Sequence, residues 1–241
     1  MFISLIIPAY NEERRIVDTL EKADAFFQMQ PYAAEIIVVD DGSNDKTVEQ
    51  VEAFQKRAST PLHLERLPEN RGKGAAVRQG MLHRAQGQYR FFFDADSSTP
   101  IEELLRCDDL LEGRCDVLIG SRALPESKIH QRQAWYRTTM GRCFNRIARM
   151  LRLTVYSDTQ CGFKGFTQEA AELCFSRQTI EGFGFDAEIL YIAAKHGLRI
   201  VELPVNWYNS PQSKVNPLFD ASRMFLDLLV VLKNNRTGRY D

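Results

Sequence analysis

Two aspartates, Asp94 and Asp96, stand one residue apart directly after the aromatic run Phe91–Phe93. The run has the bulk of a strand, so the pair is expected at a strand end, just before a helix-start signal at Thr99. Carboxylates this close repel each other unless a cation lies between them, and oxygen ligands favour Mg²⁺ or Mn²⁺ over Zn²⁺. The pair therefore indicates half of a divalent-metal site. The alternative is structural, with Asp96 as a turn residue and Asp94 as a solvated strand end.

Further charged residues follow two earlier segments of the chain. Asp40 and Asp41 come directly after the apolar run Ile36–Val39, and Lys73 lies in the loop sequence NRGKG. The acids could accept hydrogen bonds from a base or ribose, the lysine could meet phosphate, and a metal could bridge a diphosphate. Taken singly, the acidic segment is also typical of a helix-capping turn and the loop of a solvated surface. Together they indicate a nucleotide site.

Two familiar nucleotide signatures are missing. No G-x-G-x-x-G pattern follows the first apolar run, where the sequence reads PAYNEE, which argues against a nicotinamide-type site. Leu67 and Gly74 stand where a P-loop needs a glycine and a hydroxyl residue. Any nucleotide would therefore be held by acids, a lysine loop and a metal.

Apolar runs alternate with amphipathic segments through the first half of the chain. The predicted strands are Ile3–Pro8, Ile36–Val39, Leu62–Leu67 and the Phe91 run. The predicted helices start at Asn11, at Ser43 or Asn44, after Lys73 and at Pro100, the first two positions being expected caps. This alternation predicts a Rossmann-like α/β fold with a mostly parallel sheet flanked by helices. Ligands of such sheets bind at the carboxyl ends of the strands, where the charged residues fall.

The pattern changes after a predicted strand at residues 116–120. Residues 129–153 contain six arginines and no acid, and Arg142, Arg146 and Arg149 lie opposite an apolar helical face. This helix is either a solvated basic face or an interfacial helix on anionic lipid.

The remaining segments complete an α/β pattern with a C-terminal amphipathic helical region. We interpret QCGFKGF, residues 160–166, as a compact turn. It is followed by predicted helices from about Gln168 and near Asp186, a strand at 199–205 and a helical tail at 217–233.

Composition excludes several classes of protein. The 241-residue chain has a net charge of -1, so no overall field draws it to nucleic acid. Its five cysteines include no CxxC pair, which favours reduced thiols in the cytoplasm. Met1 leads directly into a predicted strand, and no stretch reaches the roughly 18 apolar residues of a membrane span, so we expect neither signal peptide nor transmembrane helix. The sequence carries no signal for an oligomeric state.

Several short motifs occur in order from about Ile3 to Lys214: IIPAYNEE, VVDDGSNDKT, NRGKGAAVRQG, DAD, GSR and DTQCGFK. Their combination resembles the family-2 glycosyltransferases with the GT-A fold. The sequence GSRA, the arginine-rich helix and FDAE resemble more specifically the dolichyl-phosphate β-glucosyltransferase branch of the polyprenyl-phosphate sugar synthases.

The resemblance implies roles for individual residues. Those implied around the donor nucleotide are Pro8, Tyr10, Glu12, Asp40, Asp41, Lys73, Ala95 and Arg122. Asp94 and Asp96 are implied to hold Mg²⁺ or Mn²⁺ on the diphosphate, and Asp158 and Gln160 to line the catalytic centre. Arg122, Arg137 and Lys214 are implied to meet the acceptor phosphate. A role as base for Asp158 or Asp94 stays open.

The implied activity is metal-dependent, inverting transfer of a hexose to a polyprenyl or dolichyl phosphate, with UDP-glucose as the expected donor, at the cytoplasmic face of a membrane. We expect one domain over residues 1–241, with a nucleotide-sugar half (1–122) and an acceptor half (123–241). Members of this branch often carry a membrane-spanning helix, which this chain lacks. Two alternatives therefore stay open: a glycosyltransferase with a soluble glycan or protein acceptor, and a non-catalytic nucleotide-sugar sensor.

Overall fold

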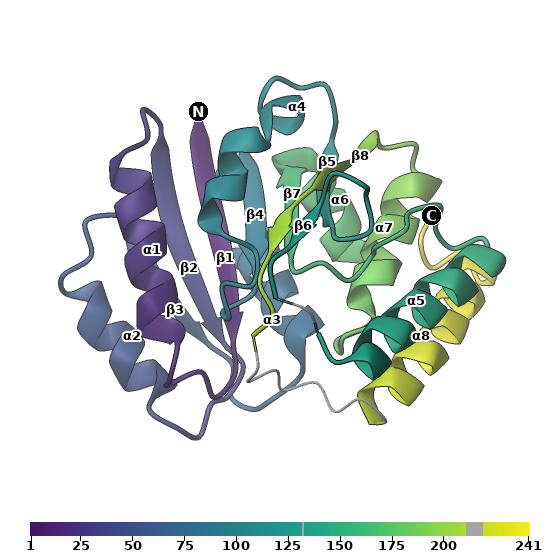
Figure 1. Cartoon of the computed structure of the whole chain (residues 1–241), viewed down its shortest axis with the longest axis horizontal. Helices are drawn as coiled ribbons and strands as arrows, with labels where there is room; N and C mark the ends of the chain where they lie inside the picture. Colours follow the sequence, from purple (N-terminus) through teal and green to yellow (C-terminus); the bar gives the residue numbers. More distant parts are fainter. Residues whose placement is uncertain (132, 211–218) are drawn as a thin grey trace.

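A seven-stranded mixed sheet forms the centre of the molecule (Figure 1). It is seen in a computed structural model, which describes residues 1–131, 133–210 and 219–241. The strand order is β3-β2-β1-β4-β7-β5-β8, and neighbours are parallel except where β7 pairs with β4 and β5. The strands are β1 (Phe2–Ala9), β2 (Ala33–Asp40), β3 (Leu62–Arg66), β4 (Tyr89–Phe93), β5 (Val117–Ser121), β7 (Phe163–Thr167) and β8 (Ile200–Pro204). The predicted mostly parallel sheet is confirmed.

Helices cover both faces of this sheet. They are α1 (Ile16–Gln28), α2 (Thr47–Gln55), α3 (Lys73–Gln79) with a π-helical turn (Gly80–Arg84), a 3-10 helix (Ile101–Arg106), α4 (Asp108–Leu111), α5 (Trp135–Met150), α6 (Gln168–Arg177), α7 (Phe185–Lys195) and α8 (Phe219–Arg236). Two short strands, β6 (Lys128–Ile129) and β9 (Asn206–Trp207), pair separately in parallel. Leu5 and Ile7 of β1 pack in one core with α1 and α2, whereas Ile6 packs in the other with α3, α6 and α7. Burial on both faces explains why β1 is a continuous apolar run.

Residues 160–166 do not form the predicted turn. Most of this segment belongs to β7, which runs antiparallel between β4 and β5, with Gly165 opposite Phe91. A Cβ atom at Gly165 would lie 2.3 Å from the Phe91 ring, so glycine permits the close approach of the two strands. The prediction was wrong because two glycines and Lys164 interrupt the apolar pattern by which a strand is recognised in sequence.

The first two helices also begin later than predicted. α1 starts at Ile16 and α2 at Thr47, and neither has a side-chain cap. Asn11 instead adopts a φ of 54°, and its side-chain oxygen accepts a hydrogen bond from the backbone N–H of Asn44 (2.8 Å). Ser43 in turn accepts one from the backbone N–H of Asn11 (2.8 Å). The predicted caps were wrong because these side chains join the loops after β1 and β2.

Both amphipathic helices predicted in the second half are present. α5 and α8 lie side by side (Figure 1), and the rings of Phe144 and Phe225 pack with centroids 5.7 Å apart. Within the three described ranges, no helix combines the length and the apolar character that crossing a membrane requires.

The five cysteines differ sharply in exposure, which gives a first testable prediction. Cys143 on α5 is exposed, and the other four are buried. Burial raises the pKa of Cys115 to about 11 and that of Cys174 to about 12. We expect Ellman's reagent to modify one thiol in the native protein and five in denaturant, because buried thiols stay protonated. A Cys143→Ser variant should then show no rapid reaction; rapid modification of a second native thiol would contradict this distribution.

Candidate active site

The loops after β1, β2 and β4 follow parallel strands and so lie at one edge of the sheet. Ala9 and Asp40, the last residues of β1 and β2, are paired, and the Asp41 N–H donates to the Ala9 carbonyl oxygen (2.8 Å). Asp40 Oδ2 accepts from the backbone N–H of Ser43 (3.2 Å). Its Oδ1 is buried and has no hydrogen-bond partner within the part of the chain that the structure describes. A buried acceptor of this kind suits a ligand N–H or O–H donor.

Asp41 holds the loop that leads to Lys73. Its two carboxylate oxygens accept from the backbone N–H groups of Arg71 and Gly72, both at 2.8 Å. Burial raises the pKa of Asp41, and these hydrogen bonds partly offset that effect. Gly72 has a φ of 112°, and a Cβ atom there would lie 2.5 Å from the Glu181 carbonyl oxygen. The glycine of the NRGKG loop is thus required by backbone geometry, and the loop sets the position of Lys73.

Lys73 reaches the aspartate pair from the first residue of α3. Its ammonium lies 2.5 Å from Asp94 Oδ1. Burial alone would raise the pKa of Asp94, but Lys73, together with Lys164 and Arg122, outweighs it and holds this pKa below its usual range. Burial, and then the charge of Asp94, raise the pKa of Asp96. The repulsion predicted between the two carboxylates therefore raises the pKa of Asp96 and not that of Asp94, because the positive charge of Lys73 compensates the negative charge of Asp94.

Close packing and hydrogen bonds fix the backbone around the pair. Asp94 packs on Gly162, where a Cβ atom would lie 1.9 Å from Asp94 Oδ2, so no larger residue fits. The carbonyl oxygen of buried Ala95 accepts from the Thr19 hydroxyl (2.8 Å), which ties the loop to α1. Asp96 Oδ1 accepts from the backbone N–H of Ser98 (2.9 Å).

Arg122 and Asp158 form a second charged unit. Arg122 donates from Nε to Asp158 Oδ2 (2.7 Å) and from Nη2 to Oδ1 (2.8 Å), and its backbone N–H also donates to Oδ2 (2.9 Å). Burial alone would lower the pKa of Arg122, but the Asp158 carboxylate more than offsets this, so that the pKa is raised. The guanidinium carbon lies 5.5 Å from the Trp207 ring centroid. A bidentate pair of this type fixes the orientation of the arginine.

Gln160 follows this unit closely. Its backbone N–H donates to Asp158 Oδ1 (3.1 Å), while its side-chain Nε2 is buried without a partner among the described residues. Gln160 therefore supplies a donor, and Asp40 an acceptor, that a bound molecule can satisfy.

The remaining sequence-predicted residues lie at the end of β1, on α5 or outside the described residues. Half-buried Pro8 and Tyr10 are at the end of β1, and buried Glu12 pairs with Arg15, a residue the sequence analysis did not single out. Arg137 is half-buried in the first turn of α5. The predicted acceptor residue Lys214 lies outside the described residues.

Sequence reasoning also missed a buried ion pair behind the aspartates. Lys164 Nζ lies 2.5 Å from Asp186 Oδ1 and 2.7 Å from the Cys161 carbonyl oxygen, and its side chain is fully buried. Its charge helps to lower the pKa of Asp94 and of Asp158, after the contributions of Lys73 and Arg122. The available signal was a lysine within FKGF, because a cation in an apolar strand requires a buried acid.

The donor set fits a divalent cation that is shared with a substrate. No group of three or more Asp, Glu, His or Cys side chains suited to a metal occurs within the described ranges. Asp94 and Asp96 thus offer two carboxylates, and Mg²⁺ is commonly held by one or two carboxylates together with substrate phosphates. The raised pKa of Asp96 agrees with this, since a cation would relieve the repulsion from Asp94.

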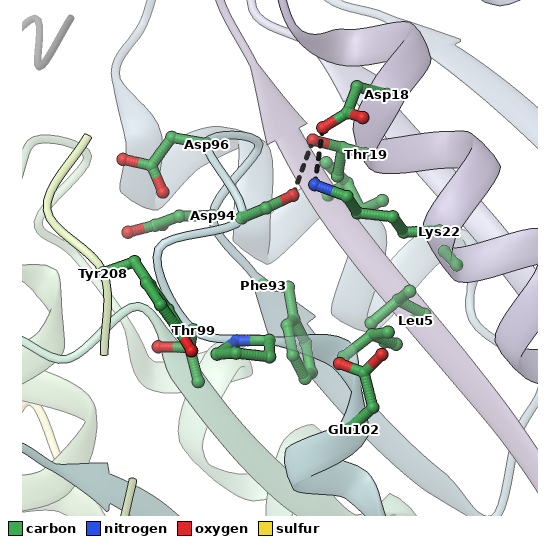
Figure 2. Close-up of a pocket in the computed structure, with 15 residues that line it drawn as sticks. Leu5, Asp18, Thr19, Lys22, Phe93, Asp94, Asp96, Thr99, Glu102 and Tyr208 are labelled. Atoms are coloured by element: carbon green, nitrogen blue, oxygen red, sulfur yellow. Dashed lines mark hydrogen bonds and ion pairs between the residues drawn. The ribbon is translucent and has the colours of Figure 1, made fainter. Parts of the chain in front are cut away.

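A cavity of about 390 Å³ lies beside the aspartate pair. Figure 2 shows its wall of Asp94, Asp96 and Tyr208, and Leu5 and Phe93 give it an apolar floor. Its volume is in the range of small-molecule sites. The cavity adjoins the aspartate pair on the side of α1, and none of Asp40, Lys73, Arg122, Asp158 and Gln160 lines it.

The sequence model described as "Glycosyl transferase family 2" matches residues 4–175. Three relatives, each named dolichyl-phosphate β-glucosyltransferase, match nearly the whole chain. The Dictyostelium discoideum protein is 34% identical over 240 residues, covering 95% of this chain and 73% of the relative. The Homo sapiens protein is 32% identical over 250 residues (99% and 77%), and the Saccharomyces cerevisiae protein is 33% identical over 259 residues (100% and 77%).

Solved structures share the fold. Glucosyl-3-phosphoglycerate synthase from Mycobacterium tuberculosis, in complex with Mn²⁺ and UDP-glucose, has a TM-score of 0.69 and 19% identity, covering 98% of this chain and 79% of that one. The same enzyme with Mn²⁺, UDP and glucosyl-3-phosphoglycerate has a TM-score of 0.67 and 21% identity, with coverage of 98% and 80%. This likeness confirms the predicted GT-A-type fold.

Proposed function

Since this chain belongs to glycosyl transferase family 2, we propose that it transfers glucose from UDP-glucose to dolichyl or another polyprenyl phosphate, with inversion at the anomeric carbon. The observation that carries the proposal is the match, at 32–34% identity over nearly the whole chain, to relatives named for this activity. Such an acceptor resides in a membrane, and we place the reaction at the cytoplasmic face.

Asp94 and Asp96 would hold Mg²⁺ or Mn²⁺ on the donor diphosphate. When bound, the cation supplies charge stabilisation for the departing nucleotide. Lys73, at the carboxylate pair, supplies a second positive charge for the same phosphates. Asp40 Oδ1, at the end of β2, is the proposed acceptor for a base or ribose donor.

On the acceptor side, positioning matters more than deprotonation. A phosphate monoester is largely ionised near neutral pH, so its oxygen can attack the anomeric carbon without a base. Both Asp158 oxygens accept from Arg122, which favours Asp158 as the residue that orients the arginine rather than as a base. Arg122, Arg137 and Lys214 are the proposed ligands of the acceptor phosphate.

This assignment divides the chain into two functional halves. Residues 1–122 would bind the nucleotide sugar, and residues 123–241 would bind the acceptor. Strand β7 and the residues around it, from the second half, pack directly behind Asp94 of the first. We therefore propose that the two halves work as one domain.

The test is a transfer assay with the purified protein, radiolabelled UDP-glucose, a short-chain polyprenyl phosphate, and Mn²⁺ or Mg²⁺. We expect label to enter the organic phase, and the chelator EDTA to stop transfer because the diphosphate loses its cation. Equal yield with EDTA would contradict the metal role. Label found only in water-soluble product would instead support a soluble acceptor, and intact donor under every condition would support a binding-only protein. Parallel reactions with other nucleotide sugars test the choice of glucose.

A further inference from the structure

Arg15, in the loop between β1 and α1, joins two distant parts of the chain. It donates from Nε to Glu12 Oε2 and from Nη2 to Glu12 Oε1 (2.8 Å). It also donates from Nη1 to the hydroxyl oxygen of Ser210 (2.8 Å), which lies after β9. One guanidinium therefore connects a residue predicted to contact the donor nucleotide with the second half of the chain.

Residues 206–210, here called the bridging segment, contact both charged units of the candidate site. The Trp207 ring centroid lies 5.5 Å from the guanidinium carbon of Arg122. The backbone N–H of Tyr208 donates to the carbonyl oxygen of Ser98 (2.8 Å), in the loop of the aspartate pair. The Tyr208 side chain lines the cavity beside that pair (Figure 2). The segment to which this arginine binds is therefore part of the site.

The aspartate pair also acts on the charge of Arg15. Burial alone would lower the pKa of Arg15, but the carboxylate of Glu12 and then the aspartate pair outweigh it, so that this pKa is raised. In return, the charge of Arg15 offsets part of the rise in the pKa of Asp96. The guanidinium thus lies close enough to the predicted metal site to share its electrostatics.

The ion pair of Arg15 and Glu12 constrains its partners more than a surface pair does. Glu12 is buried, and both of its carboxylate oxygens accept from one guanidinium, which fixes the orientation of the carboxylate. Each of these oxygens has a second lone pair that a ligand N–H or O–H can use. By contrast, the Lys22–Asp18 pair on α1 is exposed, and pairs of that kind contribute little.

We propose that Arg15 is a positioning residue that connects the donor side of the site with the acceptor side. Through Glu12 it orients a carboxylate for the nucleotide, and through Ser210 it holds the bridging segment. Lys214, a proposed ligand of the acceptor phosphate, follows Ser210 in the sequence, so this contact fixes where the chain towards Lys214 begins. The inference rests on the proposed function, because the donor and the acceptor are those of the transfer reaction.

Hydrogen exchange tests the contact with the bridging segment without any substrate. Mass spectrometry of peptides that cover residues 206–210 measures the exchange. We expect Arg15→Met and Ser210→Ala to accelerate exchange there about tenfold, because each removes a hydrogen bond to a charged group. Ser210→Thr keeps the hydroxyl and should exchange like the parent protein. The matched control is Arg14→Met, which removes the exposed neighbouring cation and should also leave this exchange unchanged.

Donor binding and transfer kinetics separate the two contacts of Arg15. Calorimetry with UDP and Mn²⁺ should show about tenfold weaker binding for Arg15→Met, which releases the Glu12 carboxylate. Binding to Ser210→Ala should stay within about twofold of the parent value, because Glu12 keeps its partner. In the transfer assay, Ser210→Ala should raise the KM for the polyprenyl phosphate about fivefold and leave kcat unchanged.

Three outcomes would overturn the proposal. They are unchanged exchange of residues 206–210 in both Arg15→Met and Ser210→Ala, equal donor affinity of Arg15→Met and Arg14→Met, and an equal loss of donor affinity in Ser210→Ala and Arg15→Met. Circular dichroism confirms the fold of each variant. If Arg15→Met does not fold, Arg15→Lys replaces it, since lysine keeps the charge but cannot form the paired hydrogen bonds.

The two proposals fail separately. Hydrogen exchange and UDP binding need no turnover, so both report on Arg15 even in a protein that transfers nothing. Accelerated exchange and weakened UDP binding in Arg15→Met, together with a parent protein that transfers no glucose, would refute the proposed function and leave the positioning role of Arg15 standing.

Discussion

An Asp94→Asn variant should lose about three orders of magnitude in kcat/KM. Asparagine keeps the shape of the side chain but removes the negative charge that pairs with Lys73 and that would hold the cation. Initial rates of glucose transfer, measured at saturating Mn²⁺, provide the comparison. Donor affinity, measured by calorimetry, should fall in parallel if the cation is held between this carboxylate and the diphosphate.

The matched control for Asp94→Asn is Asp108→Asn on α4, an exposed aspartate for which we expect unchanged kinetics. Thermal unfolding of both variants separates lost chemistry from lost structure. Retention of full activity by a folded Asp94→Asn protein would show that the metal assignment is wrong.

Replacing Lys164 with methionine should lower the free energy of unfolding by about 3–5 kcal/mol. Methionine preserves most of the apolar stem, but it removes the ammonium, which lies 5.2 Å from the Phe92 ring centroid, and leaves the carboxylate of Asp186 buried without its cation. Urea denaturation followed by circular dichroism measures the change. The exposed pair Lys195–Asp241 has the same 2.5 Å separation, so Lys195→Met is the control and should change stability by less than about 1 kcal/mol.

A second substitution distinguishes charge burial from lost packing. In the double variant Lys164→Met/Asp186→Leu neither charge remains, so we expect recovery of about half or more of the lost stability. Additive losses in the double variant would mean that packing, not the unpaired carboxylate, accounts for the effect of Lys164→Met.

The sheet and most of its helices could be predicted because their signals are local. Ile3–Pro8 is largely apolar, and the aromatic run before Asp94 ends at a pair of acidic residues. Both segments are therefore predicted to be strands that end next to candidate site residues. Strand β7 could not be recognised, because its identity depends on pairing with β4 and β5, which are distant in sequence. Tertiary pairing decided a segment whose local pattern favours a turn.

The residue types of the candidate site could be predicted from the sequence, but the contacts between their side chains could not. The sequence places Asp94, Asp96 and Lys73 on one edge, yet the contact between Lys73 and Asp94 depends on the conformation of the Gly72 loop. The sequence analysis assigned Arg122 to the phosphates and Asp158 to the catalytic centre without relating them, whereas three hydrogen bonds join them into one unit. Such pairs arise from folding, and no spacing rule in a single sequence specifies them.

The central position of β7 also constrains how the enzyme moves. Its backbone hydrogen bonds connect β4, which leads to the aspartate pair, with β5, which leads to Arg122. Separating these two parts would break a strand ladder in the middle of the sheet, and such ladders open only near the full cost of unfolding. Substrates must therefore enter and leave without separation of these strands, and the slowest amide hydrogens to exchange should be those of β4, β5 and β7.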